Sequence, residues 1–326
     1  MIVGTGGRLV PALLALALVL ASSGCAREEY GGFDHPRTVR LAPDGRLLVT
    51  DLGTGRDDGR VVAIDPDGGR RTLLDRLPST RGSGQAYADL AGPSGADVAP
   101  DGTVCAVIGD ATVEGRGFGT LRCGGGLVVD LEGFERRVNP DRRGPESNPY
   151  DVVSDRRGGW YVSDAAANDV LHVDGAGRGR VAADVASLAR FGGRPVQAVP
   201  TGLSLAPDGR VLVALLGGAP FGDGAGAVIA LTPASGQGQD RAELVAMAPY
   251  PIGALASADG VAVLSLGDGF RAKASGRILR YGTAAGAQAR TLADGLARPT
   301  GFALLGDGRF VVAEEGVGRL RAVGGS

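Results

Sequence analysis

Five acidic residues stand at the ends of short apolar runs, where carboxylates could bind a cation. The five are Asp51, Asp110, Asp164, Asp268 and Glu314, and in a sixth, longer segment Asp223 takes the corresponding place. Three of them, Asp51, Asp164 and Glu314, lie at the same seven-residue distance from the preceding turn. If the carboxylates converge, they could hold Ca²⁺, which prefers several oxygen ligands, or a cationic molecule. Alternatively, they are solvated turn residues, since Asp favours strand ends for local hydrogen-bonding reasons.

A second set of polar residues surrounds a proline that recurs along the chain. Its members are Arg37, Ser94, Glu146, Asn148, Tyr150, Thr201 and Thr300, with Ile252 in the fifth repeat. We expect these residues to line one end of a central channel and to contact a ligand there. Glu146 and Asn148 could contact the ligand or a metal, or could cap the turn into the following strand.

Other reactive side chains lack the sequence context of a catalytic site. The sequence has only two histidines, and both fit structural positions: His172 lies inside an apolar strand and His35 in a chain-closing segment. Ser163 has no histidine near it in sequence, and there is no Gly-x-Ser-x-Gly elbow. The glycines at 124–126 lack the strand–helix context of a phosphate loop.

A six-fold repeat predicts the elements that would position these residues. The recurring prolines, spaced about 50 residues apart, are Pro36, Pro93, Pro149, Pro200, Pro251 and Pro299. Eight residues after each proline comes a turn, which is Asp-Gly in five repeats and Arg157-Gly158 in the third. Apolar runs flank each turn, and Asp-Gly between such runs is a strong hairpin signal. For these hairpins we expect the two-residue turn in which both central residues have positive φ.

The repeat predicts an all-β, six-bladed β-propeller with four-stranded antiparallel blades. A third strand is recognisable in every repeat, and a fourth at 71–74, 242–246 and 289–292. The last repeat ends near Val323 without a fourth strand, so we expect residues 27–33 to supply it and to close the ring. After the N-terminal segment, no helix of ten or more residues is expected. Residues 26–326 would form one domain.

The N-terminal segment predicts that the chain lies outside the cytoplasm, where a disulfide can form. Residues 1–25 contain Arg8, an apolar run too short to span a bilayer, and the stretch LASSGC that ends at Cys25. This pattern resembles a bacterial lipobox with Cys25 lipidated, although Ser22 stands where Leu is usual, and simple cleavage and secretion is the alternative. Cys105 and Cys123 fall on neighbouring strands of one blade, which favours a disulfide over two buried thiols.

Composition excludes several partners. The net charge is −2 and the chain holds 57 glycines, as suits many tight turns. No attraction to nucleic acid is expected, and contact with a membrane only through the lipid anchor. We expect a monomer.

Several stretches resemble the ScyD/ScyE family of exported bacterial propellers, which is related to NHL-type repeats. They are DLEGFERRVNP at 130–140, ESNPY at 146–150, WYVSDAAANDVLHVD at 160–174, VPTGL at 199–203, LLGGAPFGD at 215–223 and PTGF at 299–302. The resemblance implies a six-bladed fold and export. The family is named after clusters for the indolic pigment scytonemin, and its activity is poorly defined.

These observations predict a cell-envelope module that binds a small molecule or a protein partner at the channel face, without catalysis. The second hypothesis is a Ca²⁺-dependent lactonase or esterase that resembles the gluconolactonase and paraoxonase propellers, in which Glu and Asn or Asp hold the metal at the channel entries. Here the entries are mostly Ser, Thr and Ile, and Asn148 is the main match. The family name suggests a third hypothesis, the processing of a pigment or alkaloid.

Overall fold

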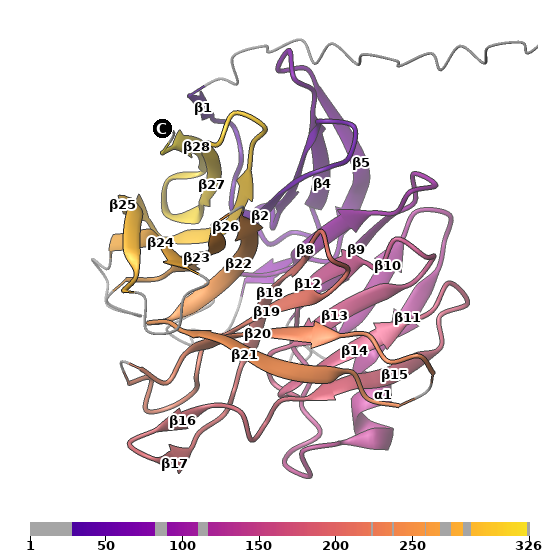
Figure 1. Cartoon of the computed structure of the whole chain (residues 1–326). Helices are drawn as coiled ribbons and strands as arrows, with labels where there is room; N and C mark the ends of the chain where they lie inside the picture. Colours follow the sequence, from indigo (N-terminus) through magenta and orange to yellow (C-terminus); the bar gives the residue numbers. More distant parts are fainter. Residues whose placement is uncertain are drawn as a thin grey trace, which may run out of the picture.

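The computed structural model describes residues 28–81, 90–109, 117–222, 224–236, 238–257, 259–267, 275–282 and 288–324. Six antiparallel, four-stranded sheets are arranged around one axis (Figure 1). Their innermost strands contact one another in the closed order β2, β8, β12, β18, β22, β26 and back to β2. The chain is therefore a six-bladed β-propeller, as the sequence predicts.

Blades 1 to 5 are each built from four strands that follow one another in the chain, whereas blade 6 takes its fourth strand from the N-terminal segment. Blade 1 has β2 (Pro36–Leu41), β3 (Leu47–Asp51), β4 (Gly59–Ile64) and β5 (Arg70–Leu77). Blade 2 has β8 (Pro93–Val98), β9 (Val104–Ile108), β10 (Thr120–Cys123) and β11 (Val128–Asp130). Blade 3 has β12 (Pro149–Ser154), β13 (Trp160–Asp164), β14 (Asp169–Val173) and β15 (Gly179–Asp184). Blade 4 has β18 (Pro200–Leu205), β19 (Val211–Leu215), β20 (Ala227–Thr232) and β21 (Arg241–Met247). Blade 5 has β22 (Pro251–Ser257), β23 (Gly260–Ser265), β24 (Ser275–Gly282) and β25 (Arg290–Ala297). Blade 6 has β26 (Pro299–Leu304), β27 (Phe310–Glu314), β28 (Arg319–Val323) and β1 (Glu29–Tyr30).

The six repeated prolines are the first residues of the six innermost strands. Proline suits a strand's first residue because it has no N–H to donate to the sheet. Next to each proline the pairing with the second strand shifts register. Such bulges increase local twist, which turns the strand towards the axis.

The core lies between the blades. Six clusters of buried apolar residues fill the six interfaces between neighbouring blades. One, for example, joins Val153 and Tyr161 of blade 3 to Val211 and Val213 of blade 4. Both faces of each sheet are thus buried, and removing this apolar area from water stabilises the ring.

The Asp-Gly turns differ from the expected type. In the first hairpin, Gly45 has φ +85° and donates its N–H to the carbonyl of Ala42, but Asp44 does not have positive φ. Asp44 instead accepts the N–H of Arg46 at 3.1 Å. The same arrangement recurs at Asp101, Asp208 and Asp307. The expectation of two positive-φ residues is wrong: a turn with Pro43 and Asp44 at its centre needs the left-handed conformation only at the glycine.

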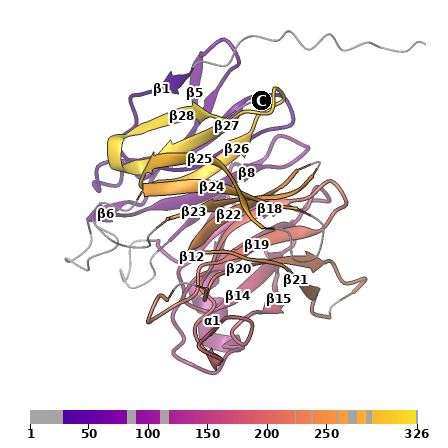
Figure 2. The ribbon, with the colours of Figure 1, turned by 60° about the vertical axis from the view of Figure 1, so that its left-hand side comes forward.

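The N-terminal segment closes the ring, as predicted. Strand β1 pairs with β28, with Glu29 opposite Arg321 and Tyr30 opposite Leu320 (Figure 2). Tyr30 and Phe33 are buried in the cluster between blades 6 and 1. Closure leaves the last blade without an unpaired edge at β28.

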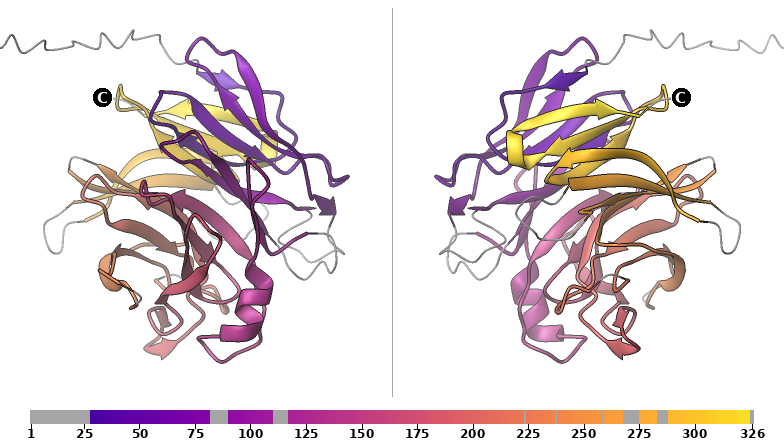
Figure 3. Two further views of the ribbon diagram at one scale, coloured as in Figure 1. Left: turned by 90° about the vertical axis from the view of Figure 1, so that its right-hand side faces the viewer. Right: turned by 90° about the vertical axis from the view of Figure 1, so that its left-hand side faces the viewer.

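Several smaller features complete the fold. Cys105 and Cys123 lie opposite each other on β9 and β10 and form the predicted disulfide. One α-helix that the sequence analysis did not predict, α1 (Leu131–Val138), follows β11 at the periphery (Figure 3). It has eight residues, and Asp130 caps its N-terminus by accepting the N–H of Gly133. Two short hairpins, β6 (Thr80–Arg81) with β7 (Leu90–Ala91) and β16 (Arg190–Phe191) with β17 (Arg194–Pro195), lie in connecting loops. Over the described ranges no helix is long and apolar enough to cross a membrane.

Candidate functional site

Four of the innermost strands have glycine at their third position, where neighbouring strands approach one another closely. These are Gly95, Gly202, Gly253 and Gly301. A Cβ on Gly202 would lie 2.5 Å from the carbonyl oxygen of Ile252 in the next blade, and one on Gly301 would lie 2.8 Å from Cα of Thr38. The channel is therefore narrow. Blades 1 and 3 carry Thr38 and Asp151 at this position.

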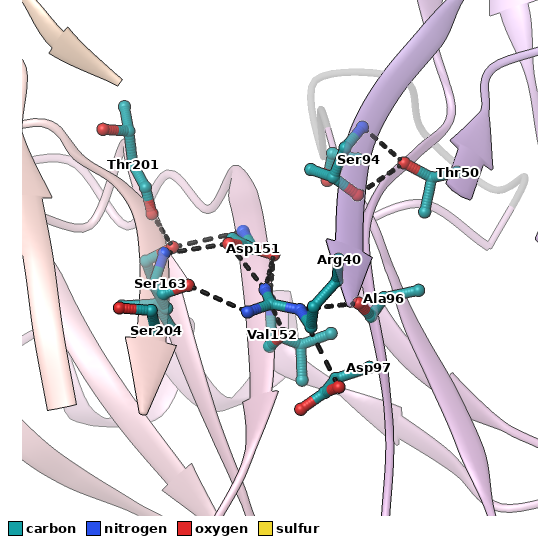
Figure 4. Close-up of polar contacts among 12 residues, drawn as sticks. Arg40, Thr50, Ser94, Ala96, Asp97, Asp151, Val152, Ser163, Thr201 and Ser204 are labelled. Carbon is teal, nitrogen blue, oxygen red and sulfur yellow. Dashed lines mark hydrogen bonds and ion pairs between the residues drawn. The ribbon is translucent and has the colours of Figure 1, made fainter. Parts of the chain in front are cut away.

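Arg40 of β2 extends across the channel and joins four blades (Figure 4). Its Nη2 lies 3.0 Å and 3.1 Å from the two carboxylate oxygens of Asp151 on β12. Nη1 donates to the carbonyl of Leu203 on β18 at 3.1 Å, and Nε donates to that of Ala96 on β8 at 3.2 Å. The guanidinium thus lies inside the channel and bridges blade 1 to blades 2, 3 and 4.

The acids of the channel are balanced by arginines. Asp97 is fully buried, with its carboxylate oxygens 3.8 Å from Nε of Arg40 and 3.4 Å from Nη2 of Arg156. Asp151 is 3% exposed. Desolvation by burial lowers the pKa of Arg40, but the charges of Asp151 and Asp97 outweigh it, so the pKa is raised and the guanidinium stays charged. Two cations and two anions therefore balance inside the channel.

The space left in the channel is small. A cavity of about 280 Å³ is lined by Arg40, Asp151 and Tyr150, and by apolar residues of blades 5 and 6 such as Leu255 and Phe302. Pockets for drug-sized ligands usually measure about 300–1,000 Å³. The channel cavity is therefore close to the lower limit of small-molecule pockets.

Three of the predicted metal-binding acids fasten loops instead. Each is fully buried and accepts an N–H from the segment that directly precedes the first strand of its own blade. The bonds run from His35 to Asp51 (2.8 Å), from Asn148 to Asp164 (2.6 Å) and from Ala297 to Glu314 (2.8 Å). Further donors are Arg60 to Asp51 (2.8 Å), Ser147 to Asp164 (2.5 Å) and Arg319 to Glu314 (2.8 Å).

The predicted ring of carboxylates is therefore not formed by Asp51, Asp164 and Glu314. Each acid is paired across the sheet with the proline that begins its blade, so its side chain reaches back to the loop before that proline. In the ranges that the structure covers, no three His, Cys, Asp or Glu side chains come together closely enough to hold a metal. Asp110, Asp223 and Asp268, like Cys25, lie outside the described residues.

The hydroxyl residues predicted to contact a ligand join neighbouring blades. Ser94, Thr201 and Thr300 are buried, and each donates to the carbonyl of the first proline in the next blade. The acceptors are Pro149 for Ser94 (2.7 Å), Pro251 for Thr201 (3.3 Å) and Pro36 for Thr300 (3.1 Å). Ile252 is part of the apolar core. These four side chains hold the ring together.

The structure brings Arg37 and Tyr150 together at the predicted channel mouth. The Arg37 guanidinium lies 5.0 Å from the Tyr150 ring centroid and 3.4 Å from Glu315, which the sequence analysis missed. Glu315 is also 3.9 Å from His35. Glu146 is exposed, and Asn148 is half-buried, with its backbone tied to Asp164. The ligand predicted from the sequence would bind at this mouth.

A larger cleft lies on the opposite, hairpin face between blades 3 and 4. It measures about 970 Å³ and is lined by Asp155, Arg157, Tyr161, His172, Arg178, Arg180, Pro207 and Ser235 among others; we call it the blade 3–4 cleft. His172 Nε2 lies 2.8 Å from Asp155, and the Tyr161 hydroxyl donates to Asp240 at 2.9 Å. Arg180 also binds Asp240, at 3.0 Å.

The cleft offers two exposed cationic side chains, of which one is unpaired among the described residues. Arg178 is 83% exposed and pairs only locally with Asp174, and Arg157 is exposed with no ion-pair partner in the described part of the chain. This cleft could not be recognised in the sequence because it forms between blade 3, which supplies His172 and Arg180, and a hairpin of the following blade. The one available signal was the third repeat's turn, where Arg157 replaces the usual Asp.

Fold and site together define a six-bladed propeller with a plugged channel and an open cleft beside it. The sequence matches no protein-family model, and no curated protein matches it. Solved six-bladed propellers resemble it in structure. An aldose sugar dehydrogenase from Streptomyces coelicolor is 17% identical with a TM-score of 0.56, over 91% of this chain and 96% of that one.

Two further structures are similar. A gluconolactonase from Xanthomonas campestris is 13% identical with a TM-score of 0.54, over 93% of each chain. A virginiamycin B lyase from Staphylococcus aureus is 12% identical with a TM-score of 0.53, over 91% of this chain and 98% of that one. At such identities the likeness shows the fold alone.

Proposed function

We propose that this chain is an exported, non-catalytic propeller of the ScyD/ScyE type that binds a small anionic molecule in the blade 3–4 cleft. The observation that carries the proposal is the pairing of a plugged channel with a roomy cationic cleft. At about 970 Å³ the cleft matches the size of small-molecule pockets. Exposed arginines recognise carboxylates and phosphates through charge-assisted hydrogen bonds.

The donors of the cleft are already oriented by neighbouring groups. Asp155 fixes the imidazole of His172, whose ring also contacts Tyr161 edge-on at 4.8 Å between centroids. Arg157 lines the same cleft and has no ion-pair partner among the described residues. A carboxylate or phosphate could supply that missing charge, and an aromatic group could pack against the exposed ring of Pro207.

The lactonase hypothesis is second. In the propeller hydrolases that motivated it, Glu and Asn or Asp hold Ca²⁺ at the channel entries, where this chain has mostly Ser, Thr and Ile. Here the axial acids described are Asp97 and Asp151, and Arg40 holds both. A metal at the axis would have to displace that guanidinium, so this donor set does not fit a catalytic calcium ion.

Calorimetric titration with phenyl phosphate and with benzoate tests the proposed function. We expect binding that Arg157→Gln and His172→Gln each weaken about tenfold or more, since a charge-assisted hydrogen bond contributes about 1.5–3 kcal/mol. Arg46→Gln, on the same face in blade 1, is the matched control and should bind normally.

Two results would contradict the proposal. One is binding that is lost in Arg37→Gln at the channel mouth but kept in Arg157→Gln, which would place the site on the opposite face. The other is Ca²⁺-dependent hydrolysis of gluconolactone by the unaltered protein, which would favour the hydrolase.

A further inference from the structure

Two buried carboxylates at the edge of blade 3 have no hydrogen-bond partner. Glu135 on α1 is 1% exposed and Asp169 on β14 is fully buried. All four of their carboxylate oxygens are inaccessible to solvent and unpaired. Buried carboxylates in proteins are normally paired with a cation, hydrogen-bonded or bound to a metal. This pair therefore lacks a partner that the fold would be expected to supply.

More acidic side chains lie near the pair, but too far away to share a metal ion with it. In the sheet, Asp169 lies directly opposite Asp164 on β13 and Asp184 on β15, and like charges in such positions repel. Asp141 is held next to this row, because the side chain of Asn168 donates to it at 3.1 Å. The Oδ1 atom of Asn139, one helical turn after Glu135, is also buried and unpaired.

In the described part of the chain, no basic side chain neutralises these carboxylates. In the ranges that the structure describes, no Arg, Lys or His nitrogen lies within 4 Å of Glu135, Asp164 or Asp169. Arg143 approaches Asp141 only to 4.0 Å. Asp164 is satisfied separately, by Ser147 and the backbone N–H of Asn148. Among these described carboxylates, Glu135 and Asp169 are therefore the two that lack a neutralising partner.

The pKa values of the two carboxyl groups are also shifted. Burial, followed by the charges of Asp164 and Asp141, raises the pKa of Glu135 to about 7. Burial, followed by the charges of Asp164 and Glu135, raises the pKa of Asp169 well above its usual value. The two carboxylates therefore share one set of acidic neighbours, and either protons or a metal cation must neutralise them at neutral pH.

We propose that Glu135 and Asp169 bind a calcium ion between α1 and blade 3, with the amide oxygen of Asn139 as a third ligand. The donor set is made only of oxygen atoms, which suits a hard cation. Ca²⁺ accepts six to eight such ligands in flexible geometry and readily includes amide oxygens and water, whereas Mg²⁺ demands a near-ideal octahedron. Because the described residues supply no third carboxylate within reach, waters complete the shell.

The ion would tie α1 to the blade it covers. The segment from α1 to Asn148 connects the outer strand of blade 2 to Pro149, the first residue of the innermost strand of blade 3. A bound cation would fix this connection from outside the sheet. The site lies off the channel axis and outside the blade 3–4 cleft, so it is independent of the proposed ligand.

Calorimetric titration of the chelator-treated full chain with CaCl₂ tests the site, together with melting curves in CaCl₂ and in EGTA. We expect one Ca²⁺ per chain and a higher Tm in CaCl₂. Glu135→Gln and Asp169→Asn should each weaken Ca²⁺ binding about tenfold or more, because each removes a charged ligand. Glu132→Gln, on the same helix and paired with Arg136, is the matched control and should bind Ca²⁺ normally.

The same variants keep the test decisive if calcium has no effect. In EGTA only protons can neutralise the two carboxylates, and Gln or Asn needs no neutralising partner, so each variant should melt above the unaltered protein in EGTA. Calcium binding that survives in Glu135→Gln and Asp169→Asn would overturn the proposal. So would a Tm of the unaltered protein that is the same in CaCl₂ and in EGTA, because protons would then neutralise the pair.

Discussion

A single arginine fills much of the channel of this propeller and links the blades around it. Arg40 binds groups from three other blades, and its charge neutralises Asp151 inside the ring. Breaking a buried ion pair on one side leaves the other charge uncompensated, which costs far more than breaking an exposed pair. Arg40 is thus both a structural link and the reason the channel is closed.

Replacing Arg40 should strongly destabilise the protein. We expect Arg40→Met to lower the free energy of unfolding by about 3–5 kcal/mol, because Asp151 would stay buried without its partner. Arg46→Met, which removes an exposed pair with Asp44, should cost about 1 kcal/mol or less. Urea unfolding measures both. Adding Asp151→Asn to Arg40→Met should restore part of the loss; if it adds a further full loss, the two residues are not coupled.

At the scale of elements, the two-residue strand β1 closes the ring of blades despite its short length. It pairs with β28, which would otherwise be the edge strand of the last blade. It also inserts Tyr30 into the core between blades 6 and 1. Without it, β28 would present unpaired backbone groups to other chains. Ring closure thus depends on side-chain burial as well as on hydrogen bonds.

Truncating Tyr30 should loosen the closure. Tyr30 is 5% exposed, so Tyr30→Ala should lower the free energy of unfolding by about 3–5 kcal/mol and promote aggregation. Denaturant unfolding and light scattering measure the two effects. The neighbouring Glu29→Ala removes only an exposed pair with Arg319 and should change stability by about 1 kcal/mol or less. Equal effects of the two variants would show that Tyr30 burial does not hold the blade.

The whole molecule is a closed ring with a plugged axis, and we propose that it is held at the cell envelope by a lipid on Cys25. The structure describes the chain from residue 28, so this proposal stands on the sequence pattern of residues 1–25. A protein with net charge −2 has no strong electrostatic attraction to anionic membranes, so an anchor would have to supply the attachment.

Cys25→Ser should release the protein from the membrane. In bacterial cells the unaltered chain is expected in the membrane fraction, and the variant in the soluble fraction, because acyl chains provide the membrane affinity. Fractionation and immunoblotting measure the distribution. A Cys105→Ser, Cys123→Ser double variant, which lacks the disulfide, should remain in the membrane fraction. An unaltered chain found only in the soluble fraction would favour cleavage and secretion.

The number of blades, their first residues and the pairing of Cys105 with Cys123 could be read from the sequence. Each depends on local rules: a proline tolerated only where a strand begins, a glycine needed after the turn, and antiparallel strands that bring two cysteines opposite each other. Closure by residues 27–33 followed from counting strands. The turn type was predicted incorrectly because the Asp-Gly pair alone does not distinguish a two-residue turn from one that starts a residue earlier.

The partners of the polar residues were decided only by the tertiary structure. Asp51, Asp164 and Glu314 recur at one spacing, which indicated a shared site, yet the same spacing makes each of them fasten its own entry loop. Arg40 and Asp151 are distant in sequence and meet because two blades face the same axis. Spacing along one strand fixes which way a side chain points, but ring closure determines which distant group it meets. For the same reason, only the fold revealed Glu135 and Asp169 as a buried, unpaired pair.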